Sequence, residues 1–438
     1  MQHADQHRIE QLFFDISREW FLDREGSYAS IRRDGVYSDA LTIWLMILQR
    51  LSGGTLQHAL CEGLLNSKGP FVEANTRSRK LRNSDVSTNN GGFSRARQRL
   101  SKEEILSLLT YCTARLEKKS TRRIYVIDGY RVSVAHTPQN VAHWGLHKGS
   151  NNKVIHFPKV LVVAAHELSS AVSSIPVCGR IDDGEQKLGC RALASLPTGS
   201  TVIGDRGFGN FTIAHHAAAH GHTVLLRLTE EVFRRGAEVP KGEYPDEIIK
   251  KWEPSRNEAR RHCYPPQSAV SGRFIKYRVE KDGFPAQILY FFTNLLDPAE
   301  EIAALYLKRQ DVELFIRHLK QSLSLELVRA KSPQMVEKEI QIAILTFNLV
   351  ASIISYVAVK REVSYRRFSF TSTLRILRAF ATKATTMDSD EFLLQFETAL
   401  WQTKLPDRKK QRSFPRVIRR SRDRYPLWSM DTAPDEGK

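Results

Sequence analysis

The chain has 438 residues, enough for two or three domains with a sizeable core. Its net charge of +18 predicts a polyanionic partner, with nucleic acid ahead of an anionic membrane surface, although a merely basic soluble protein would share this composition. Five scattered cysteines without a C-x-x-C pair argue against a zinc module or a disulfide framework and fit a reducing cytosol. The N-terminus lacks the basic start and apolar core of a signal peptide, so we expect a cytoplasmic protein.

Residues 1 to about 120 are predicted to be helical. After a break at Asn89–Gly92, Ser94 can cap a short helix on which Arg95 and Arg99 share one face. A cationic helix face of this kind is typical of a DNA-contacting domain, and equally of a solvated basic face on an ordinary helical bundle.

From residue 121 onwards strands and helices alternate. The predicted elements are strands at 123–127, 158–165 and 171–178, a helix at 185–196, a strand at 200–204, a helix at 211–220 and a strand at 222–228. Asp128 follows the first of these strands directly and Asp205 follows the fourth, so we expect both carboxylates to emerge at strand ends. Taken singly, each is an ordinary turn residue, because Asp-Gly and Asp-Arg-Gly are common exits from a strand.

Residues 229–297 interrupt this alternation. They carry many charges, a single tryptophan (Trp252), and a predicted hairpin whose strands, 273–280 and 286–294, flank a Lys-Asp-Gly turn. We expect this segment to be β-rich.

The stretch Leu305–Lys320 is predicted to form one helix. Tyr306, Arg309, Glu313 and Lys320 are spaced by three, four and seven residues, which places them within an arc of roughly 60° on one helix face. An apolar stripe beside this arc is predicted to pack on the core; it comprises Leu305, Val312, Phe315, Ile316 and Leu319. The alternative is a surface helix with an Arg–Glu pair, which contributes only about 0.3–0.5 kcal/mol.

The C-terminal part is predicted to be helical and basic. Residues 340–359 are mostly apolar but are interrupted by polar side chains, which favours a buried helix over a membrane span. A second helix is expected at 369–382. The run Lys404–Arg424 carries ten Lys or Arg against two Asp, so it is either a solvated tail or an arm that contacts phosphates.

The pattern Tyr-x2-Arg-x3-Glu-x6-Lys resembles the signature of the DDE transposases of insertion sequences, in the branch named after these four residues (insertion-sequence family four, the relatives of transposon Tn-five). Three further stretches are similar to the family: Phe-Ser-x-Ala-Arg-x-Arg-Leu at 93–100, Thr-Pro-Gln-Asn at 137–140 before Trp144-Gly145, and Asp-Arg-Gly-Phe at 205–208. The resemblance spans roughly residues 93–380. Tyr130 departs from it, since many relatives carry Ser or Thr there.

The resemblance implies an α/β fold, with a ribonuclease-H-like mixed sheet, a β-rich insertion and flanking helical regions. The implied domains are a helical DNA-binding region at 1–120, a catalytic domain at 121–335 interrupted by the insertion at 229–297, and a helical, basic region at 336–438. This architecture would bring Asp128 and Asp205 beside the helix that carries Glu313.

The resemblance also implies the chemistry of the site. Asp128, Asp205 and Glu313 would be the catalytic residues and would hold two divalent ions, Mg²⁺ or Mn²⁺, which suit hard oxygen ligands and phosphodiester displacement. Three clustered carboxylates without a cation are unstable, which agrees with this role. The residues implied to contact DNA are Tyr306, Arg309, Lys320, Arg206, Trp252, Arg95 and Arg99. For Trp252 the implied role is stacking on a flipped base, and a core position is the alternative.

The function implied is that of a DNA transposase in the prokaryotic cytoplasm, associated with the nucleoid. Its partners would be double-stranded DNA, both the terminal inverted repeats of the element and the target, without any membrane. We expect a homodimer when the protein is assembled on DNA. Two alternatives remain open: a metal-dependent nuclease that cuts without joining, and a non-catalytic DNA-binding protein derived from a transposase.

Overall fold

The fold was analysed in a computed structural model that describes residues 16–406 with internal gaps. The gaps are residues 18, 22, 24–34, 54, 66–70, 72–77, 84–85, 117–122, 148–156, 243, 282–283 and 384–388. The strands are β1 Ile124–Val134, β2 Lys159–Glu167, β3 Val177–Arg180, β4 Thr201–Gly204, β5 Thr223–Leu228, β6 Glu247–Trp252, β7 Val270–Lys281, β8 Phe284–Thr293 and β9 Leu327–Val328.

Helices precede, interrupt and follow these strands. They are α2 Asp39–Ser52, α3 Leu56–Leu60, α5 Arg79–Arg82, α6 Asn90–Arg99, α7 Lys102–Leu116, α8 Pro138–Trp144, α9 Glu185–Leu193, α10 Phe211–Ala219, α11 Glu230–Ala237, α12 Arg256–His262, α13 Ala299–Leu307, α14 Gln310–Arg317, α15 Pro333–Lys360, α16 Phe370–Lys383 and α17 Ser389–Gln402. A π-helix, η4 His318–Ser322, continues α14.

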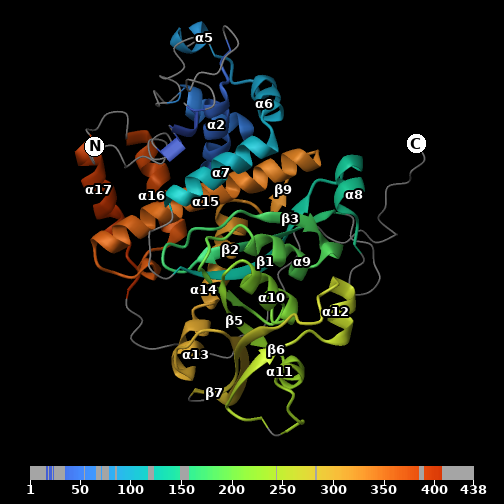
Figure 1. Cartoon of the computed structure of the whole chain (residues 1–438). Helices are drawn as coiled ribbons and strands as arrows, with labels where there is room; N and C mark the ends of the chain where they lie inside the picture. Colours follow the sequence, from blue (N-terminus) through green and yellow to red (C-terminus); the bar gives the residue numbers. More distant parts are fainter. Residues whose placement is uncertain are drawn as a thin grey trace, which may run out of the picture.

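A mixed sheet forms the centre of the molecule (Figure 1). Its strand order is β3-β2-β1-β4-β5-β8-β7-β6, and β9 pairs with β1 off this path. The strands β1, β4 and β5 run parallel, while β2 and β3 form the antiparallel side. The predicted α/β fold with a ribonuclease-H-like mixed sheet is therefore confirmed. The third predicted strand begins later than expected, because residues 168–176 form a longer connection that leads into β3.

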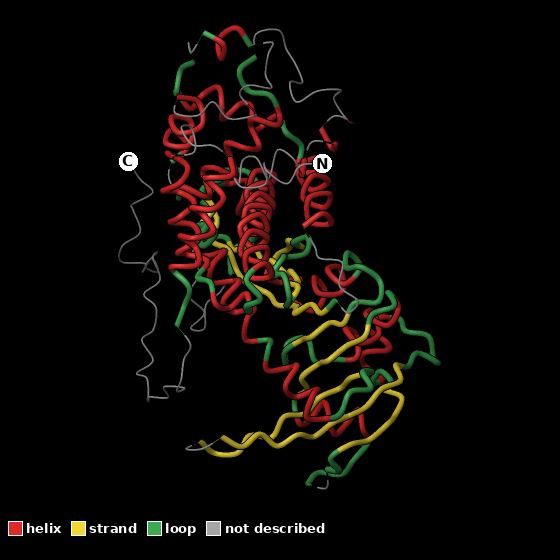
Figure 2. Tube along the Cα trace, turned by 90° about the vertical axis from the view of Figure 1, so that its left-hand side faces the viewer, coloured by secondary structure: helices red, strands yellow, loops and turns green. Residues whose placement is uncertain are grey.

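The insertion adds three strands to this same sheet. β8 pairs antiparallel with β5, and β7 and β6 follow outwards. The predicted hairpin is present as β7 and β8, although its Asp282-Gly283 turn lies outside the described residues. Figure 2 shows these strands reaching away from the helical part of the molecule. The insertion thus extends the central sheet instead of interrupting it.

Helices cover both faces of the sheet. On one face α9 and α10 contribute Leu188 and Phe211 to a core that also contains Tyr125 of β1. On the other face α13 and α14 contribute Tyr306 and Val312, next to Val126 of β1. Side chains of alternate strand residues point to opposite faces, so the even-numbered residues of β1 share one face: Val126 packs with α13 and α14, and Tyr130, Val132 and Val134 pack in the cluster that contains α15.

Helix α15 joins the N-terminal helices to the sheet. Figure 1 shows it between α2 and α7 on one side and the strands on the other, and residues of all these elements share one hydrophobic cluster. Among the described residues it is the one helix long and apolar enough to cross a membrane, but 78% of its most apolar window is buried inside the protein. The predicted buried helix at 340–359 is confirmed.

Helix α6 begins earlier than predicted. Asn89 is its N-cap, with its side-chain oxygen accepting a hydrogen bond from the N–H of Gly91 at 3.1 Å, so the cap is not Ser94. The glycines at 91 and 92 lie inside the helix and do not break it. A Cβ at Gly92 would lie 2.9 Å from the ring of Tyr37, so the close approach of this aromatic ring requires glycine there.

The expectation of one continuous helix over residues 305–320 is wrong. At the junction of α13 and α14 the N–H groups of Lys308 and Arg309 donate to carbonyls only three residues back, those of Leu305 and Tyr306, at 3.1 and 2.9 Å. This tight turn ends α13 and starts α14, and the chain then widens into the π-helix η4 that carries Lys320.

Candidate active site

Asp128 and Asp205 are neighbours on parallel strands. The parallel pairing of β1 with β4 ends at Val126 and Ile203, and each aspartate lies two residues beyond this last pair. Both alternate onto the face covered by α13 and α14, because Val126 and Ile203 belong to the cluster on that face. Asp205 follows the end of β4 as predicted.

The expectation that Asp128 would stand at a strand end is wrong, because Asp128 is the fifth residue of the eleven in β1. β1 continues past the aspartate since β2 pairs with it from Tyr125 to Ser133 and β9 pairs with its last residues. The parallel partner β4 ends beside the carboxylate, which is half-buried.

The surroundings of Asp128 raise its pKa to about 6. Burial is the largest cause; the neighbouring carboxylates of Asp205 and Glu185 add to it. The N–H of Gly129, which donates to Oδ1 of Asp128 at 2.8 Å, and the nearby Arg309 act in the opposite direction. The site therefore gathers negative charge in a partly buried place.

Glu185, the first residue of α9, reaches this place from the other face of the sheet. A Cβ at Gly129 would lie 2.9 Å from its carboxyl carbon, and a Cβ at Gly207 would lie 3.5 Å from its Oε2 and 3.2 Å from Oδ1 of Asp205. Sequence reasoning gave Glu185 no role of its own. The signal was the acidic run at 182–185 that leads into the helix between the two aspartates.

Arg309 lies among the carboxylates. Its Nη2 donates to Oε1 of Glu313 at 3.3 Å, and its side chain is only 16% exposed, against 61% for Glu313. Burial lowers the pKa of Arg309, but Tyr306, Asp205, Asp128 and Glu313 together raise it above its ordinary value. The signature spacing thus brings Arg309 and Glu313 together despite the break between α13 and α14.

Tyr306 is not a phenol over a cleft, as the helix arc predicted. Its side chain is buried, its ring packs 5.0 Å from that of Phe291, and its hydroxyl has no hydrogen-bond partner among the described residues. The guanidinium groups of Arg227 and Arg309 each lie 5.9 Å from the ring centroid. Tyr306 therefore supports Arg309 from the core side and does not face solvent.

Lys320 lies close to Asp128. Its Nζ is 5.7 Å from the ring centroid of Tyr130, and Asp128 is one of the charges that act on it. Its pKa is lowered, mainly by burial and further by Lys159 and Arg131, while Glu326 and Asp128 oppose this. The departure from the family at Tyr130 thus provides an aromatic surface beneath Lys320.

The donor atoms of this site suit a hard divalent cation, because carboxylate oxygens are the ligands that Mg²⁺ and Mn²⁺ prefer. The pKa of Asp128 is raised mainly by burial and further by Asp205 and Glu185, and a bound cation would offset both effects. In the described part of the chain, however, no three acidic, His or Cys side chains converge closely enough to hold a metal. The donor groups fit such a cation in their chemistry, and Glu313 is the carboxylate that is hydrogen-bonded to Arg309.

The other predicted DNA contacts are spread over the molecule. Arg206 is exposed in the turn after Asp205, and Arg95 and Arg99 are exposed on α6, one helical turn apart. Trp252 is 4% exposed, with its ring 4.7 Å from Phe292. The structure therefore supports the alternative of a core tryptophan, and Trp252 cannot stack on a base without leaving the core. The basic run lies outside the described residues from 407 onwards.

The sequence of this chain is similar to those of known transposases. The family described as "Transposase DDE domain" matches residues 119–349, more than half of the chain. A transposase named InsG, of insertion sequence element IS4 in Escherichia coli (strain K12), is 25% identical to this chain over 370 residues, which cover 78% of each protein.

Proposed function

This chain belongs to the family of transposases with a DDE domain, enzymes that cut DNA and transfer its strands with the help of divalent metal ions, and from this premise we propose that Asp128, Asp205 and Glu313 are its three active-site carboxylates. The observation that carries the proposal is the position of Arg309. It is paired with Glu313 and is affected electrostatically by both aspartates, so one guanidinium group interacts with all three carboxylates.

The cofactor we propose is a pair of Mg²⁺ or Mn²⁺ ions held by these carboxylates. When bound, two such ions activate an attacking oxygen and stabilise the departing oxygen of a phosphodiester. The pairing of β1 with β4 fixes the backbone next to Asp128 and Asp205. The side chain of Glu313, in contrast, is largely exposed. Oε1 of Glu313 accepts the hydrogen bond from Arg309, so a cation that used both oxygens would displace this bond and leave Arg309 available to a phosphate.

We assign the phosphate contacts near the cut to Arg309, Lys320 and Arg206. Arg309 is held in place by Tyr306, so Tyr306 acts on DNA through Arg309. Lys320 is partly withdrawn from water above Tyr130, where a charge-assisted hydrogen bond to a phosphate is strong. The exposed cations of α6, Arg95 and Arg99, are assigned to the DNA flanking the cut.

The substrates we propose are the terminal inverted repeats of an insertion sequence and a target duplex, bound by a homodimer that assembles on DNA. A nuclease that cuts without joining would use the same carboxylates, so only the product distinguishes the two. A non-catalytic DNA-binding descendant has no need for Asp128, Asp205, Glu313 and Lys320 together, and their presence favours the enzyme.

Replacement of each carboxylate tests the assignment. Asp205→Ala and Glu313→Ala should each abolish Mg²⁺- or Mn²⁺-dependent cleavage of end DNA while binding to the same DNA persists. Asp182→Ala removes a carboxylate that is 71% exposed on the same domain and serves as the matched control. A wild-type cleavage rate in either site variant would remove that residue from the proposal, and strand joining to a second duplex separates the transposase from the nuclease.

Arg309→Ala tests the phosphate contact. In single-turnover cleavage it should slow the reaction more than it weakens overall DNA binding, because Arg309 lies at the carboxylates and not on the outer surface. Lys308→Ala, which removes an exposed cation one residue away, is the control. If Arg309→Ala cuts as fast as the wild type, the signature spacing is that of a surface helix only.

A further inference from the structure

A cleft of about 890 Å³ opens between the N-terminal helices and the segment that leads from the glutamate helix into α15. We call it the α6–α15 cleft. Four cationic side chains line it, against two carboxylates, which leaves a surplus of two positive charges; these six are Arg50, Arg97, Arg329, Lys331, Glu326 and Glu339. Most of the remaining lining residues carry amide or hydroxyl groups; they are Gln49, Thr55, Asn90, Ser94, Gln98, Gln139, Ser324 and Ser332. None of the functional residues proposed above lines it.

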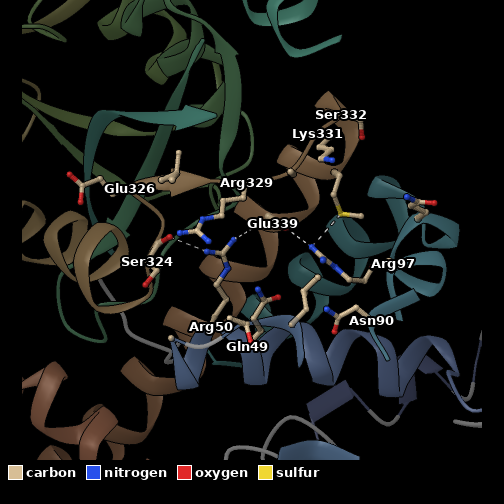
Figure 3. Close-up of a pocket in the computed structure, with 18 of the residues that line it drawn as sticks. Gln49, Arg50, Asn90, Arg97, Ser324, Glu326, Arg329, Lys331, Ser332 and Glu339 are labelled. Atoms are coloured by element: carbon tan, nitrogen blue, oxygen red, sulfur yellow. Dashed lines mark hydrogen bonds and ion pairs between the residues drawn. The ribbon is translucent and has the colours of Figure 1, made fainter. Parts of the chain in front are cut away.

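The floor of the α6–α15 cleft holds a surplus of buried charge. Arg50 and Arg97 both reach Glu339, as Figure 3 shows, and their side chains are 9% and 8% exposed. Two guanidinium groups on one carboxylate leave one positive charge without a counter-ion. The Nε of Arg97 is buried and has no hydrogen-bond partner in the described structure. A buried cation that is incompletely paired is costly, and an anion entering the cleft would offset that cost.

The rim of the cleft adds cations and an open helix end. Arg329 and Lys331 are exposed, and neither makes an ion pair with any described residue. Between them and Met335 lies the N-terminus of α15, a helix of 28 residues with no acidic residue in its first turn and no side-chain hydrogen bond from its N-cap, Ser332. Ser332 and Met335 of this positive helix end line the cleft, and the first-turn N–H groups, which Pro333 lacks, receive no hydrogen bond from the Ser332 side chain; helix ends of this kind bind phosphate.

We propose that the α6–α15 cleft binds the sugar-phosphate backbone of one strand of duplex DNA, a proposal that rests on the DNA-cutting function argued above. A single small anion would contact either the arginines of the floor or the cations of the rim. A chain of phosphates can contact both at once. Amides and hydroxyls between the cations suit the ester oxygens and sugars of such a chain. Because one wall comes from α2 and α6 and the other from residues 324–339, DNA in the cleft would contact both the N-terminal helices and the catalytic fold.

Two substitutions at residue 335 test the charge, because both remove the packing of Met335 on the core and the contact of its sulfur with Nη2 of Arg97, and they differ from each other in charge alone. Met335 occupies the third position of α15, so either Met335→Gln or Met335→Glu can complete a capping box with Ser332 and keep the helix stable. Only Met335→Glu adds an anion to the cleft. We expect Met335→Gln to bind a linear duplex of mixed sequence like the wild type and Met335→Glu to bind it about tenfold more weakly. Equal affinities of the two variants would overturn the proposal.

The rim is tested by Arg329→Gln combined with Lys331→Gln. Binding of the same duplex over a series of salt concentrations should show a slope shallower by about 0.9 for each lost phosphate contact. Arg235→Gln combined with Lys241→Gln removes the same charge from α11 and the turn after it, which lie at the opposite end of the molecule in Figure 1. The proposal fails if the rim pair keeps the wild-type slope, or if the control pair loses as much as the rim pair.

A third measurement asks what occupies the cleft. In Ser94→Cys a thiol is placed on α6 at the lining of the cleft. Its alkylation, followed by mass spectrometry, should be fast in free protein and slow with the duplex bound. Slow alkylation in free protein would mean that another part of the chain fills the cleft and would overturn the proposal. A wild-type protein that binds DNA but does not cut it with Mg²⁺ or Mn²⁺ would refute the carboxylate assignment and leave the cleft to be judged by these binding data.

Discussion

Replacement of Asp128 by Asn should make the metal-free protein more stable while it destroys cleavage. The carboxylate of Asp128 is partly buried beside two other carboxylates, and its pKa is raised to about 6 from an ordinary value of 3.8. Asn has nearly the same shape and can still accept the hydrogen bond from the N–H of Gly129. It has no charge to bury, so the variant avoids a cost that the wild type bears in order to bind a cation.

The magnitude and its pH dependence follow from the two pKa values. A shift of about two units corresponds to about 3 kcal/mol, and about 2–3 kcal/mol is expected because the side chain keeps some contact with solvent. Between about pH 4 and pH 6 the folded state keeps a proton on Asp128 that the unfolded state has lost, so wild-type stability falls as the pH rises through this window. Above pH 6 both states are ionised and the penalty is complete; below pH 4 it is absent.

The assay is denaturant unfolding of the wild type and Asp128→Asn in a chelating buffer at pH 4 and pH 7. The variant should gain about 2–3 kcal/mol over the wild type at pH 7 and little at pH 4. Added Mg²⁺ should stabilise the wild type more than the variant and narrow the difference. Asp246→Asn, at a side chain that is 89% exposed, is the control and should change little. A variant that is less stable at pH 7, or whose gain is the same at both pH values, would refute this account of the site.

Three further predictions concern other parts of the molecule. Gly129→Ala places a Cβ 2.9 Å from the carboxyl carbon of Glu185 and should slow cleavage at saturating DNA; Glu185→Ala in the same chain should restore part of the rate if crowding is the cause. Glu339→Gln leaves two buried arginines without their carboxylate and should lower the free energy of unfolding by about 3–5 kcal/mol in denaturant titrations. A chain truncated after Thr403 lacks the ten cations of the basic run, so it should bind specific and non-specific DNA more weakly by similar factors and with a shallower salt slope, while unchanged slopes would favour a structural role for that run.

Local patterns in the sequence predict the strands and helices between residues 123 and 228 in the observed order, except for the helix α8 between β1 and β2, which they do not predict. Runs of β-branched and aliphatic residues mark β1, β4 and β5; Asp128 lies within β1, and Asp205 directly follows the end of β4. The length of β1 could not be predicted from its own residues. It continues past Asp128 because β2 and β9 pair with it, and such pairing depends on segments that lie up to 200 residues away.

The pairing of the insertion with the central sheet and the burial of Trp252 could not be predicted either, because both depend on contacts with segments distant in the sequence. Alternation within the hairpin predicts two strands, but not that β8 joins β5 and so makes the insertion part of the central sheet. Trp252 then lies at the inner end of the edge strand β6, paired with Val270, where Phe292 and its neighbours enclose the ring. A lone tryptophan in a charged segment gives no indication of which side of a sheet it will occupy.

The signature residues show where helical spacing is a reliable guide and where it is not. A three-residue and a four-residue step bring Tyr306, Arg309 and Glu313 together in a regular helix, and they stay together here because both i→i+3 and i→i+4 contacts survive one tight turn. The seven-residue step to Lys320 crosses the change from α-helix to π-helix, so its position depends on tertiary contacts with Tyr130. Spacing also could not reveal that the tight turn buries Tyr306 against Phe291.

The ion pairs of Glu339 provide a structural connection between the α6–α15 cleft and the segment after the glutamate helix. Glu339 on α15 holds Arg50 of α2 and Arg97 of α6, and Arg50 also donates to the carbonyl of Ser324, four residues after Lys320. The N-terminal helices are therefore fastened, through buried charged groups, to the segment that directly follows the glutamate helix. DNA that binds in the α6–α15 cleft would act on these same groups. A DNA strand held in the cleft would therefore affect the position of Lys320 through Arg50 and Ser324. The sheet next to the two aspartates would not have to rearrange.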